Sequence, residues 1–343
     1  MTKPETTPAS AQAASKPLVE IEGLVKEFGP FRAVDGLSFS VSKGEVLGFL
    51  GPNGAGKSTT MKMITGFLAP TAGRIHVAGF DLADDLLPAQ GCIGYLPEGA
   101  PAYPEMTPRQ YLEFIAEIRG ARGAEVAEKV ETAVARTQLG AVLEQPIETL
   151  SKGFKRRVGL AQAILHDPPV LIMDEPTDGL DPNQKHAVRD LIAEMSADKA
   201  IIISTHILEE VEAVCTRAII IDRGRIVADG TPTQLNARSR YHNAVTVVVD
   251  SDAAGRTMAV LESVTGVDII EEVRDADGTV RLTAFPKKPE MHLAGPVGAA
   301  LDADGVNVRA LHAEPGRLDD VFRAVTTSDA APESTASGAA TAA

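Results

Sequence analysis

The sequence predicts an α/β protein that carries a second, smaller α+β domain, and two observations support this prediction. Over the first two thirds of the chain, short apolar runs alternate with helical segments, which is typical of a parallel sheet covered by helices on both faces. After about residue 240 the order becomes strand, helix, two strands, helix and strand. A length of 343 residues is sufficient for two domains of ordinary size.

Composition and charge exclude several classes of protein. The net charge of −14 argues against a nucleic-acid-binding surface, so no nucleic-acid partner is expected. Cys92 and Cys215 match no metal-ligand spacing and fit a reducing cytosol. The chain has no apolar run of the ~18 residues that span a bilayer, and its first 17 residues lack the apolar core of a signal peptide. We therefore expect a soluble cytoplasmic protein.

The two ends of the chain and one internal stretch mark the predicted boundaries. Residues 1–17 and 328–343 are rich in Ala, Ser, Thr and Pro and are expected to be disordered tails. A polar stretch at residues 236–243 is interpreted as a linker. The first domain would then span residues 18–239, and a βαββαβ accessory domain of the ferredoxin-like kind would span residues 240–327.

Within the first domain, unbroken apolar runs predict the parallel strands. These runs are Val46–Leu50, Val170–Met173 and Ala200–Ser204. Residues 19–41 and 74–78 instead alternate between apolar and polar or small side chains, which predicts an antiparallel β subdomain beside the parallel sheet.

Residues from about 97 to 150 are expected to form a helical subdomain. The pattern between residues 107 and 140 is helical, with a break at Gly120 and Gly123. The apolar side chains expected to share one helix face are Tyr111, Phe114, Ile115 and Ile118.

Six elements are expected after the linker. They are a strand at 245–249, a helix at 257–264, a hairpin at 267–285, a helix at 292–301, a strand at 306–311 and a final helix at 318–325.

A glycine-rich turn between a predicted strand and a predicted helix is the first motif that carries chemistry. Its sequence fits G-x-x-x-x-G-K-[ST], in which backbone N–H groups surround a phosphate and the helix N-terminus adds positive partial charge. Lys57 is expected to bridge the β- and γ-phosphates of ATP, and the Ser58 hydroxyl to ligate Mg²⁺. The expected nucleotide-binding residues of this turn are Gly51, Pro52, Asn53, Gly54, Ala55, Gly56, Lys57, Ser58 and Thr59.

Two carboxylates end the buried strand that begins near Val170. Alone, such a pair is usually a solvated turn, but downstream of a phosphate loop it becomes the second half of a nucleotide site. Asp174 would hold Mg²⁺, and Glu175 would polarise the attacking water, a role commonly worth ~10²–10⁴-fold in rate.

The order of the motifs along the chain resembles that of the ATP-binding-cassette (ABC) ATPases. The phosphate loop is followed by Leu150–Phe154, then by Asp174 and Glu175, then by Gly179–Pro182 and finally by Ser204–His206. Several independent motifs in one order are far more specific than any one of them, and the resemblance covers residues 18 to about 235.

The resemblance implies further site residues. Phe28 lies where an aromatic ring stacks on adenine, although simple core packing also suits a phenylalanine, and Val34 would line the same pocket. Glu98 lies where the family usually carries glutamine and would also ligate Mg²⁺; its charge near the γ-phosphate should slow hydrolysis.

A second set of residues is implied to act across a dimer. Ser151 and Gly153 would contact the γ-phosphate held by the opposite subunit, although Ser151 read alone is an ordinary helix N-cap. Asp181 would lie at the dimer seam, and His206 would contact the γ-phosphate and sense hydrolysis. Lys152 departs from the family pattern, which usually has glycine there.

Residues 94–114 and 315–322 are similar to one branch of the family, the ATPase subunits of type-2 exporters, including those associated with gliding motility. This implies a homodimer that drives an integral membrane permease from the inner face of the cell membrane. The alternative is a soluble ABC ATPase that acts on the ribosome or on DNA. A single cassette, the short separation of Lys57 and Ser151 and the acidic balance favour the exporter. A metabolic kinase would leave Ser151, Asp181 and His206 unexplained.

Overall fold

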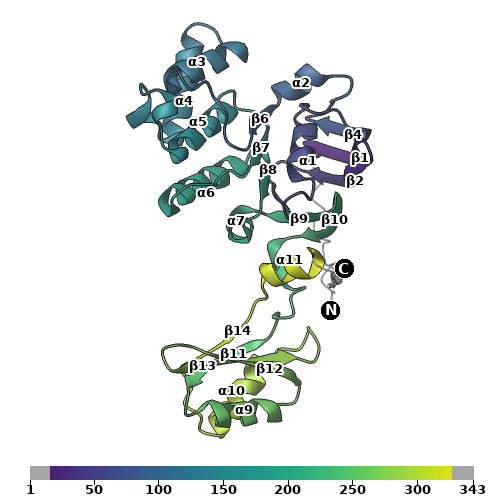
Figure 1. Ribbon diagram of the computed structural model, residues 1–343, viewed down its shortest axis with the longest axis vertical. Coiled ribbons are helices and arrows are strands. Elements are labelled where there is room, and N and C mark those ends of the chain that lie inside the picture. Colours follow the sequence, from purple (N-terminus) through teal and green to yellow (C-terminus); the bar gives the residue numbers. More distant parts are fainter. Residues whose placement is uncertain (1–15, 327–343) are drawn as a thin grey trace, which may run out of the picture. The chain divides into compact units, whose positions relative to one another are not determined.

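The computed structural model describes residues 16–326, so the predicted tails lie almost entirely outside the described residues. Within that range the chain forms two compact units (Figure 1). The first ends at Arg217 and takes in Arg223–Arg225, whereas the second holds Ala218–Asp222 and continues from Ile226. The predicted boundary at residues 239 and 240 stays a prediction.

Four parallel strands form the centre of the first unit. In spatial order they are β3 (Val46–Leu50), β8 (Ala200–Thr205), β7 (Val170–Asp174) and β6 (Ile93–Leu96). Every residue of β3, β7 and β8 is buried, because helices cover these apolar runs. The predicted parallel strands are therefore confirmed. Their carboxyl ends meet at one edge of the sheet, where polar loops follow.

An antiparallel sheet in the same unit has the order β2, β1, β4, β5. Its strands are β1 (Val19–Phe28), β2 (Phe31–Val41), β4 (Ala72–Val77) and β5 (Phe80–Asp81). Val19 lies opposite both Val41 and Val77, so the alternating apolar residues of β1, β2 and β4 share a buried face. This confirms the predicted antiparallel region.

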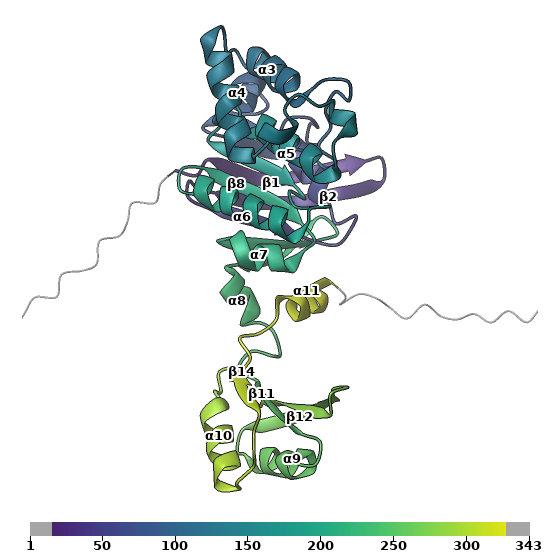
Figure 2. The same cartoon turned by 90° about the vertical axis from the view of Figure 1, so that its left-hand side faces the viewer.

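Three helices pack against one another on the helical side of the first unit: α3 (Pro108–Ile118), α4 (Ala124–Thr137) and α5 (Lys152–Ile164) (Figure 2). The predicted break between α3 and α4 is present, with Gly120 and Gly123 at positive φ.

The buried face of α3 differs from the predicted one. Tyr111 is buried as expected, but Leu112 and Ala116 accompany it, whereas Ile118 is 63% exposed. The side of α3 that faces α4 and α5 is therefore rotated from the predicted stripe, and part of that stripe is left on the surface.

The remaining elements complete the first unit and lead into the second. They are α1 (Lys57–Ile64), α2 (Leu86–Gly91), the 3-10 turns Gly140–Val142 and Ile147–Thr149, α6 (Pro182–Ser196), α7 (Leu208–Val214), β9 (Arg217–Asp222), β10 (Arg225–Gly230) and α8 (Pro232–Asn236). None of the helices between residues 16 and 326 is long and apolar enough to cross a membrane.

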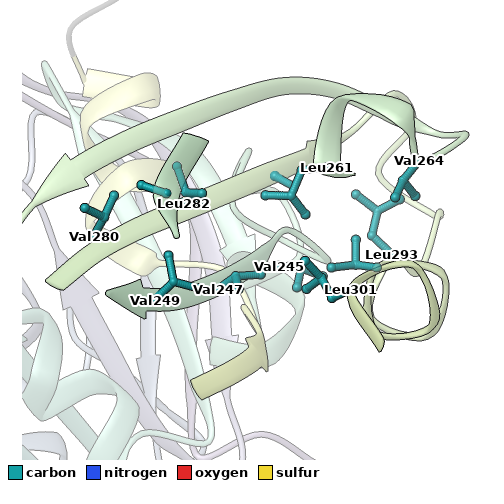
Figure 3. Close-up of a cluster of buried hydrophobic side chains, with 12 residues drawn as sticks. Val245, Val247, Val249, Leu261, Val264, Val280, Leu282, Leu293 and Leu301 are labelled. Carbon is teal, nitrogen blue, oxygen red and sulfur yellow. The ribbon is translucent and has the colours of Figure 1, made fainter. Parts of the chain in front are cut away.

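The second unit has the predicted order of elements. They are β11 (Val245–Asp250), α9 (Ala254–Ser263), β12 (Val267–Arg274), β13 (Thr279–Pro286), α10 (Ala294–Ala303), β14 (Ala310–Ala313) and α11 (Leu318–Thr326). The antiparallel sheet has the order β12, β13, β11, β14. Valines and leucines of β11 and β13 point toward Leu261 of α9 and toward Leu293 and Leu301 beside and within α10, and this cluster forms the core (Figure 3). The last strand begins later than predicted, at Ala310.

The polar stretch interpreted as a linker is held in place by the last helix. Ser239 is buried and its hydroxyl donates to Asp320 Oδ2 of α11 at 2.8 Å, while the Arg240 N–H donates to the same oxygen at 3.0 Å. Both residues therefore pair with a carboxylate some 80 positions later, and Ser239 is withdrawn from solvent.

Candidate functional site

The glycine-rich turn joins β3 to α1 and holds the Lys57 side chain in a buried position. Lys57 Nζ donates to the carbonyl oxygens of Gly51 and Pro52 at 2.6 and 3.1 Å. Burial is the largest influence and lowers the pKa of Lys57, while the nearby carboxylates of Glu175, Asp174 and Glu98 oppose it. The lysine predicted to bind phosphate thus lies among the carboxylates predicted to complete the site.

Gly56, at the start of α1, is required by its backbone conformation and by its surroundings. Its φ is +105°, and a Cβ at this position would lie 2.5 Å from the Ala33 carbonyl oxygen and in contact with Val34. The turn can therefore follow its curved path only where there is no side chain.

Asp174 and Glu175 lie at the carboxyl end of β7. Asp174 is buried, and its Oδ1 accepts a hydrogen bond from the Ser204 hydroxyl of β8. Glu175 has a φ of +50°, and its N–H donates to the Ser204 carbonyl oxygen at 2.9 Å. A non-glycine residue in the left-handed region is uncommon and is often found at functional positions. Ser204 thus binds both residues of the pair.

His206 follows β8 at the same edge of the sheet and meets Glu175 there. The separation between His206 Nδ1 and Glu175 Oε1 is 2.8 Å. The structure therefore places Lys57, Asp174, Glu175 and His206 in one region, although Lys57 and His206 are far apart in the sequence.

Arg156 of α5 connects this region to the loop after β6. The guanidinium is buried and donates to the carbonyl oxygens of Asp174 and Glu175, and its Nη1 donates to the Pro97 carbonyl at 3.1 Å. Burial lowers the pKa of Arg156, and the surrounding carboxylates oppose this effect. One side chain thus orients both the Asp174–Glu175 turn and the loop that carries Glu98, which is exposed.

Ser151, Gly153 and Asp181 form a second group of predicted residues. Ser151 caps α5 by accepting from the Phe154 N–H at 3.3 Å, and Asp181 caps α6 by accepting from the Gln184 N–H at 2.9 Å. A Cβ at Gly153 would collide with the Gln184 side chain, so the two helix N-termini lie against each other.

Lys152 joins the same two segments. Its Nζ lies 3.1 Å from Asp178 Oδ2, and this hydrogen bond is the main reason why the pKa of Asp178 is lowered. A Cβ at Gly179, whose φ is +71°, would touch the Lys152 side chain. At this position, where the resemblance implies glycine, the chain therefore has a lysine that forms an ion pair.

The two residues predicted to line an adenine pocket differ in exposure. Phe28 is half exposed at the end of β1, with Lys26 Nζ 5.3 Å from its ring centroid. Val34 is fully buried, and its side chain packs next to Gly56 of the phosphate loop.

Comparison with known proteins identifies the family. Residues 34–178 match the family model described as ABC transporter. The Nod factor export ATP-binding protein I of Ralstonia nicotianae is 32% identical over 321 residues, which is 93% of this chain and 97% of the relative. The chain belongs to the ABC transporter family.

Other relatives of this ABC ATPase agree. The linearmycin resistance ATP-binding protein LnrL of Bacillus subtilis is 36% identical over 222 residues, covering 64% of this chain and 71% of the relative. A solved ATP-binding subunit of an ABC transporter has a TM-score of 0.60 and 34% identity, covering 64% of this chain and 92% of that one. The predictions of ATP hydrolysis coupled to transport and of an exporter-like branch are confirmed. The alternative action on ribosomes or DNA is not supported.

Three residues that contact the predicted site residues have no role assigned from the sequence: Arg156, Gln184 and Ser204. The burial of Arg156 could be predicted from the sequence, because it lies at helical spacing from Gly153 and Leu160 on the buried face of α5. The contacts of Ser204 with Asp174 and of Gln184 with Gly153 can be recognised only when the neighbouring strands and helices are known.

Proposed function

We propose that two identical copies of this ABC ATPase close on two ATP molecules and thereby power export through a separate integral membrane permease. One arrangement supports this most directly. Each chain carries two groups of predicted site residues. One group lies around Lys57 and Glu175. The other consists of two helix N-termini that lie against each other and are capped by Ser151 and Asp181. Such N-termini attract anions, and a partner chain would offer them to the γ-phosphate.

In this proposal the phosphate loop binds the nucleotide through residues 51–59. Lys57 would leave its carbonyl partners and turn to the β- and γ-phosphates, while Phe28 would stack on adenine. Val34 would pack against the phosphate loop at Gly56.

The residues present fit Mg²⁺ as a cofactor. The ion prefers oxygen ligands and usually takes one or two carboxylates together with substrate phosphates. Ser58, Asp174 and Glu98 offer oxygens, and Ser204 occupies one oxygen of Asp174. Within residues 16–326 no cluster of three or more acidic, histidine or cysteine side chains is arranged to hold a metal ion. When bound, Mg²⁺ would neutralise charge on those phosphates.

Hydrolysis would then depend on the Glu175–His206 pair. Glu175 would orient and polarise the attacking water, and its left-handed backbone directs it away from the line of β7. His206 would hold Glu175 by the 2.8 Å contact and meet the γ-phosphate.

A groove between α2, β6 and α3 is the proposed docking site for the permease. Its volume is about 490 Å³, and its lining includes Phe67, Leu87, Tyr95, Ile118 and Gln162. Phe67, Leu87 and Ile118 are largely exposed apolar side chains, which is typical of an interaction surface. The Gln162 amide donates to the Tyr95 carbonyl at 2.6 Å. Because Tyr95 is three residues before Glu98, a permease bound in this groove would affect the position of the loop that carries Glu98.

This docking would hold the ATPase at the inner face of the membrane.

The second unit is proposed to be ferredoxin-like, because its strand order β14, β11, β13, β12 corresponds to the 4-1-3-2 order of a βαββαβ fold.

Affinity capture of the Glu175→Gln protein from detergent-solubilised native cells with ATP tests the proposal. We expect a membrane protein with several spans to co-purify. Light scattering of the purified Glu175→Gln protein alone with ATP should give the mass of a dimer. Ile118→Asp in the same background should lose the membrane protein, whereas the control Ile269→Asp, an equal change at a similarly exposed isoleucine of β12, should keep it. Recovery of ribosomes or DNA complexes without a membrane protein would overturn the transport assignment.

A further inference from the structure

Two cations on one face of α5 hold the turn that begins at Glu175. Lys152 and Arg156 are four residues apart, so their side chains lie on the same side of the helix. Arg156 donates to the Glu175 carbonyl oxygen, and Lys152 Nζ lies 3.1 Å from Asp178 Oδ2. The Asp178 N–H in turn donates to the Glu175 carbonyl oxygen at 3.2 Å. Both ends of the turn formed by residues 175–178 are therefore bound by α5.

The position of Lys152 is unfavourable for α5 itself. The first turn of this helix contains no acidic residue, and a cation at a helix N-terminus is disfavoured by the helix dipole. A second cation four residues later, Arg156, adds repulsion between like charges. Asp178 offsets both effects. Its pKa is lowered chiefly by the hydrogen bond with Lys152, and the charge of Arg156 lowers it further. The charge of Lys152 is thus accounted for by the contact with Asp178 and not by the stability of the helix.

The Lys152 side chain also contacts the residue that follows Asp178. A Cβ at Gly179, whose φ is +71°, would lie 2.6 Å from Lys152 Cδ and 2.9 Å from its Nζ, so the aliphatic part of the lysine lies across this glycine. Both partners of the ion pair are exposed, at 73% for the side chain of Lys152 and 49% for that of Asp178. Because exposed ion pairs add little to stability, the effect of this pair is expected in the position of the turn.

We propose that Lys152 is a positioning residue for Glu175. By binding Asp178 at the far end of the turn, it keeps the left-handed backbone of Glu175 where the carboxylate meets His206 at 2.8 Å. The inference rests on the proposed function, in which Glu175 polarises the attacking water and the N-terminus of α5 faces the nucleotide of the partner chain. Lys152 then links the part of α5 that meets the partner's nucleotide to the carboxylate that acts on the nucleotide of its own chain.

Lys152→Met tests the inference, because methionine keeps an aliphatic side chain beside Gly179 and removes the charge. We expect the kcat for ATP hydrolysis to fall about tenfold, with KM changed less than about twofold. The free energy of unfolding should not change measurably, since the ion pair is exposed. Lys152→Arg, which keeps a cation, should retain most of the kcat. A loss in Lys152→Arg as large as that in Lys152→Met would contradict a role for the charge.

Asp178→Ala distinguishes action through Asp178 from direct contact with a nucleotide. This variant should lower kcat at least as much as Lys152→Met does. The double variant should match Asp178→Ala alone, because each change removes the same ion pair. A further loss of about tenfold in the double variant would overturn the inference. The lysine would then act independently of Asp178, as it would if it bound the phosphate held by the partner chain.

Lys43 offers a matched control, because its Nζ lies 3.0 Å from Asp198 Oδ1 in another exposed ion pair of the first unit. Lys43→Met should leave kcat unchanged. Equal losses of kcat in Lys43→Met and Lys152→Met would overturn the inference, because they would indicate a general effect of lost surface charge.

Glu175→Gln distinguishes failure of the inference from failure of the proposed function. Loss of hydrolysis in Glu175→Gln with normal kcat in Lys152→Met would overturn the positioning role and leave the catalytic role of Glu175 standing. Normal hydrolysis in Glu175→Gln would overturn both.

Discussion

His206 Nδ1 lies 2.8 Å from Glu175 Oε1, and the two residues follow neighbouring parallel strands of one sheet. The pairing of β7 with β8 sets this contact, since Asp174 lies opposite Ser204 in the register. Neither residue needs a flexible loop to reach the other. Because the strand register sets this contact, the effect of each residue on ATP hydrolysis can be measured by replacing it alone.

Removing either partner should reduce hydrolysis without preventing nucleotide binding. Glu175→Gln keeps size and hydrogen-bonding capacity but loses the charge that polarises water, so kcat should fall ~10²–10⁴-fold. His206→Ala should also lower kcat, with the affinity for ATP changed less than about threefold. Phosphate release and nucleotide titration measure both quantities.

His312 offers a matched control for the histidine. It is exposed to a similar extent, 55% against 51% for the side chain of His206, and its Nε2 lies 3.5 Å from Glu314 Oε1. His312→Ala should retain full hydrolysis. If His312→Ala and His206→Ala lowered kcat equally, the specific role of the Glu175–His206 pair would be refuted.

The charge of Glu98 should limit the rate of hydrolysis. The loop that carries it is held by the Arg156 bond to the Pro97 carbonyl, so the carboxylate stays near Lys57. Glu98→Gln removes one negative charge near the γ-phosphate and should raise kcat severalfold. Glu105→Gln, the same change at an exposed glutamate of the following loop, is the control. An unchanged kcat in Glu98→Gln would contradict the charge argument.

The parts of the site that could be predicted from the sequence are those that local motifs define. The curvature of the phosphate loop follows from Gly54 and Gly56, and the buried run before Asp174 identifies a central strand. Lys57, Asp174 and Glu175 were therefore predictable, and the structure places them together.

What could not be predicted depends on distant partners. Ser239 looked like part of a solvated linker, because its acceptor, Asp320, is 81 positions away. Ile118 looked like part of a buried stripe, because nothing in α3 alone indicates which side meets α4 and α5. Arg156 is the same kind of case, since its acceptors are carbonyl oxygens of two other segments.

Gly56 should tolerate no side chain. Gly56→Ala places a Cβ against the Ala33 carbonyl at a φ of +105°, and both effects are destabilising. We expect unfolding at lower denaturant concentration, by roughly 2 kcal/mol or more, together with weaker ATP binding. Gly91→Ala is the control, because no atom outside its chain neighbours and its own helix lies within 4 Å of its Cβ position and its φ is outside the left-handed region. Equal midpoints for the two variants would show that the phosphate loop relaxes to accept a methyl group.

Stability should decrease in mildly acidic solution because of His166. This side chain is largely buried beside Arg119, and its Nε2 donates to the Ile93 carbonyl at 3.2 Å. Burial, reinforced by positive charge on Arg119, Lys129 and Lys199, lowers the pKa of His166 from 6.5 to about 4. The folded state therefore favours the neutral imidazole.

The sign of the pH effect follows from which state binds the proton. Between pH 6.5 and about 4 the unfolded chain protonates His166 and the folded chain does not, so the free energy of unfolding falls as the pH falls through this window. The loss should be roughly 1–3 kcal/mol. His166→Gln removes the titration and should flatten this part of the curve, measured by denaturant unfolding at successive pH values. His186→Gln, the same change at an exposed side chain, should keep the slope. If both variants kept the slope of the free energy of unfolding against pH, carboxylates elsewhere would cause that slope, and the effect of the buried imidazole would be refuted.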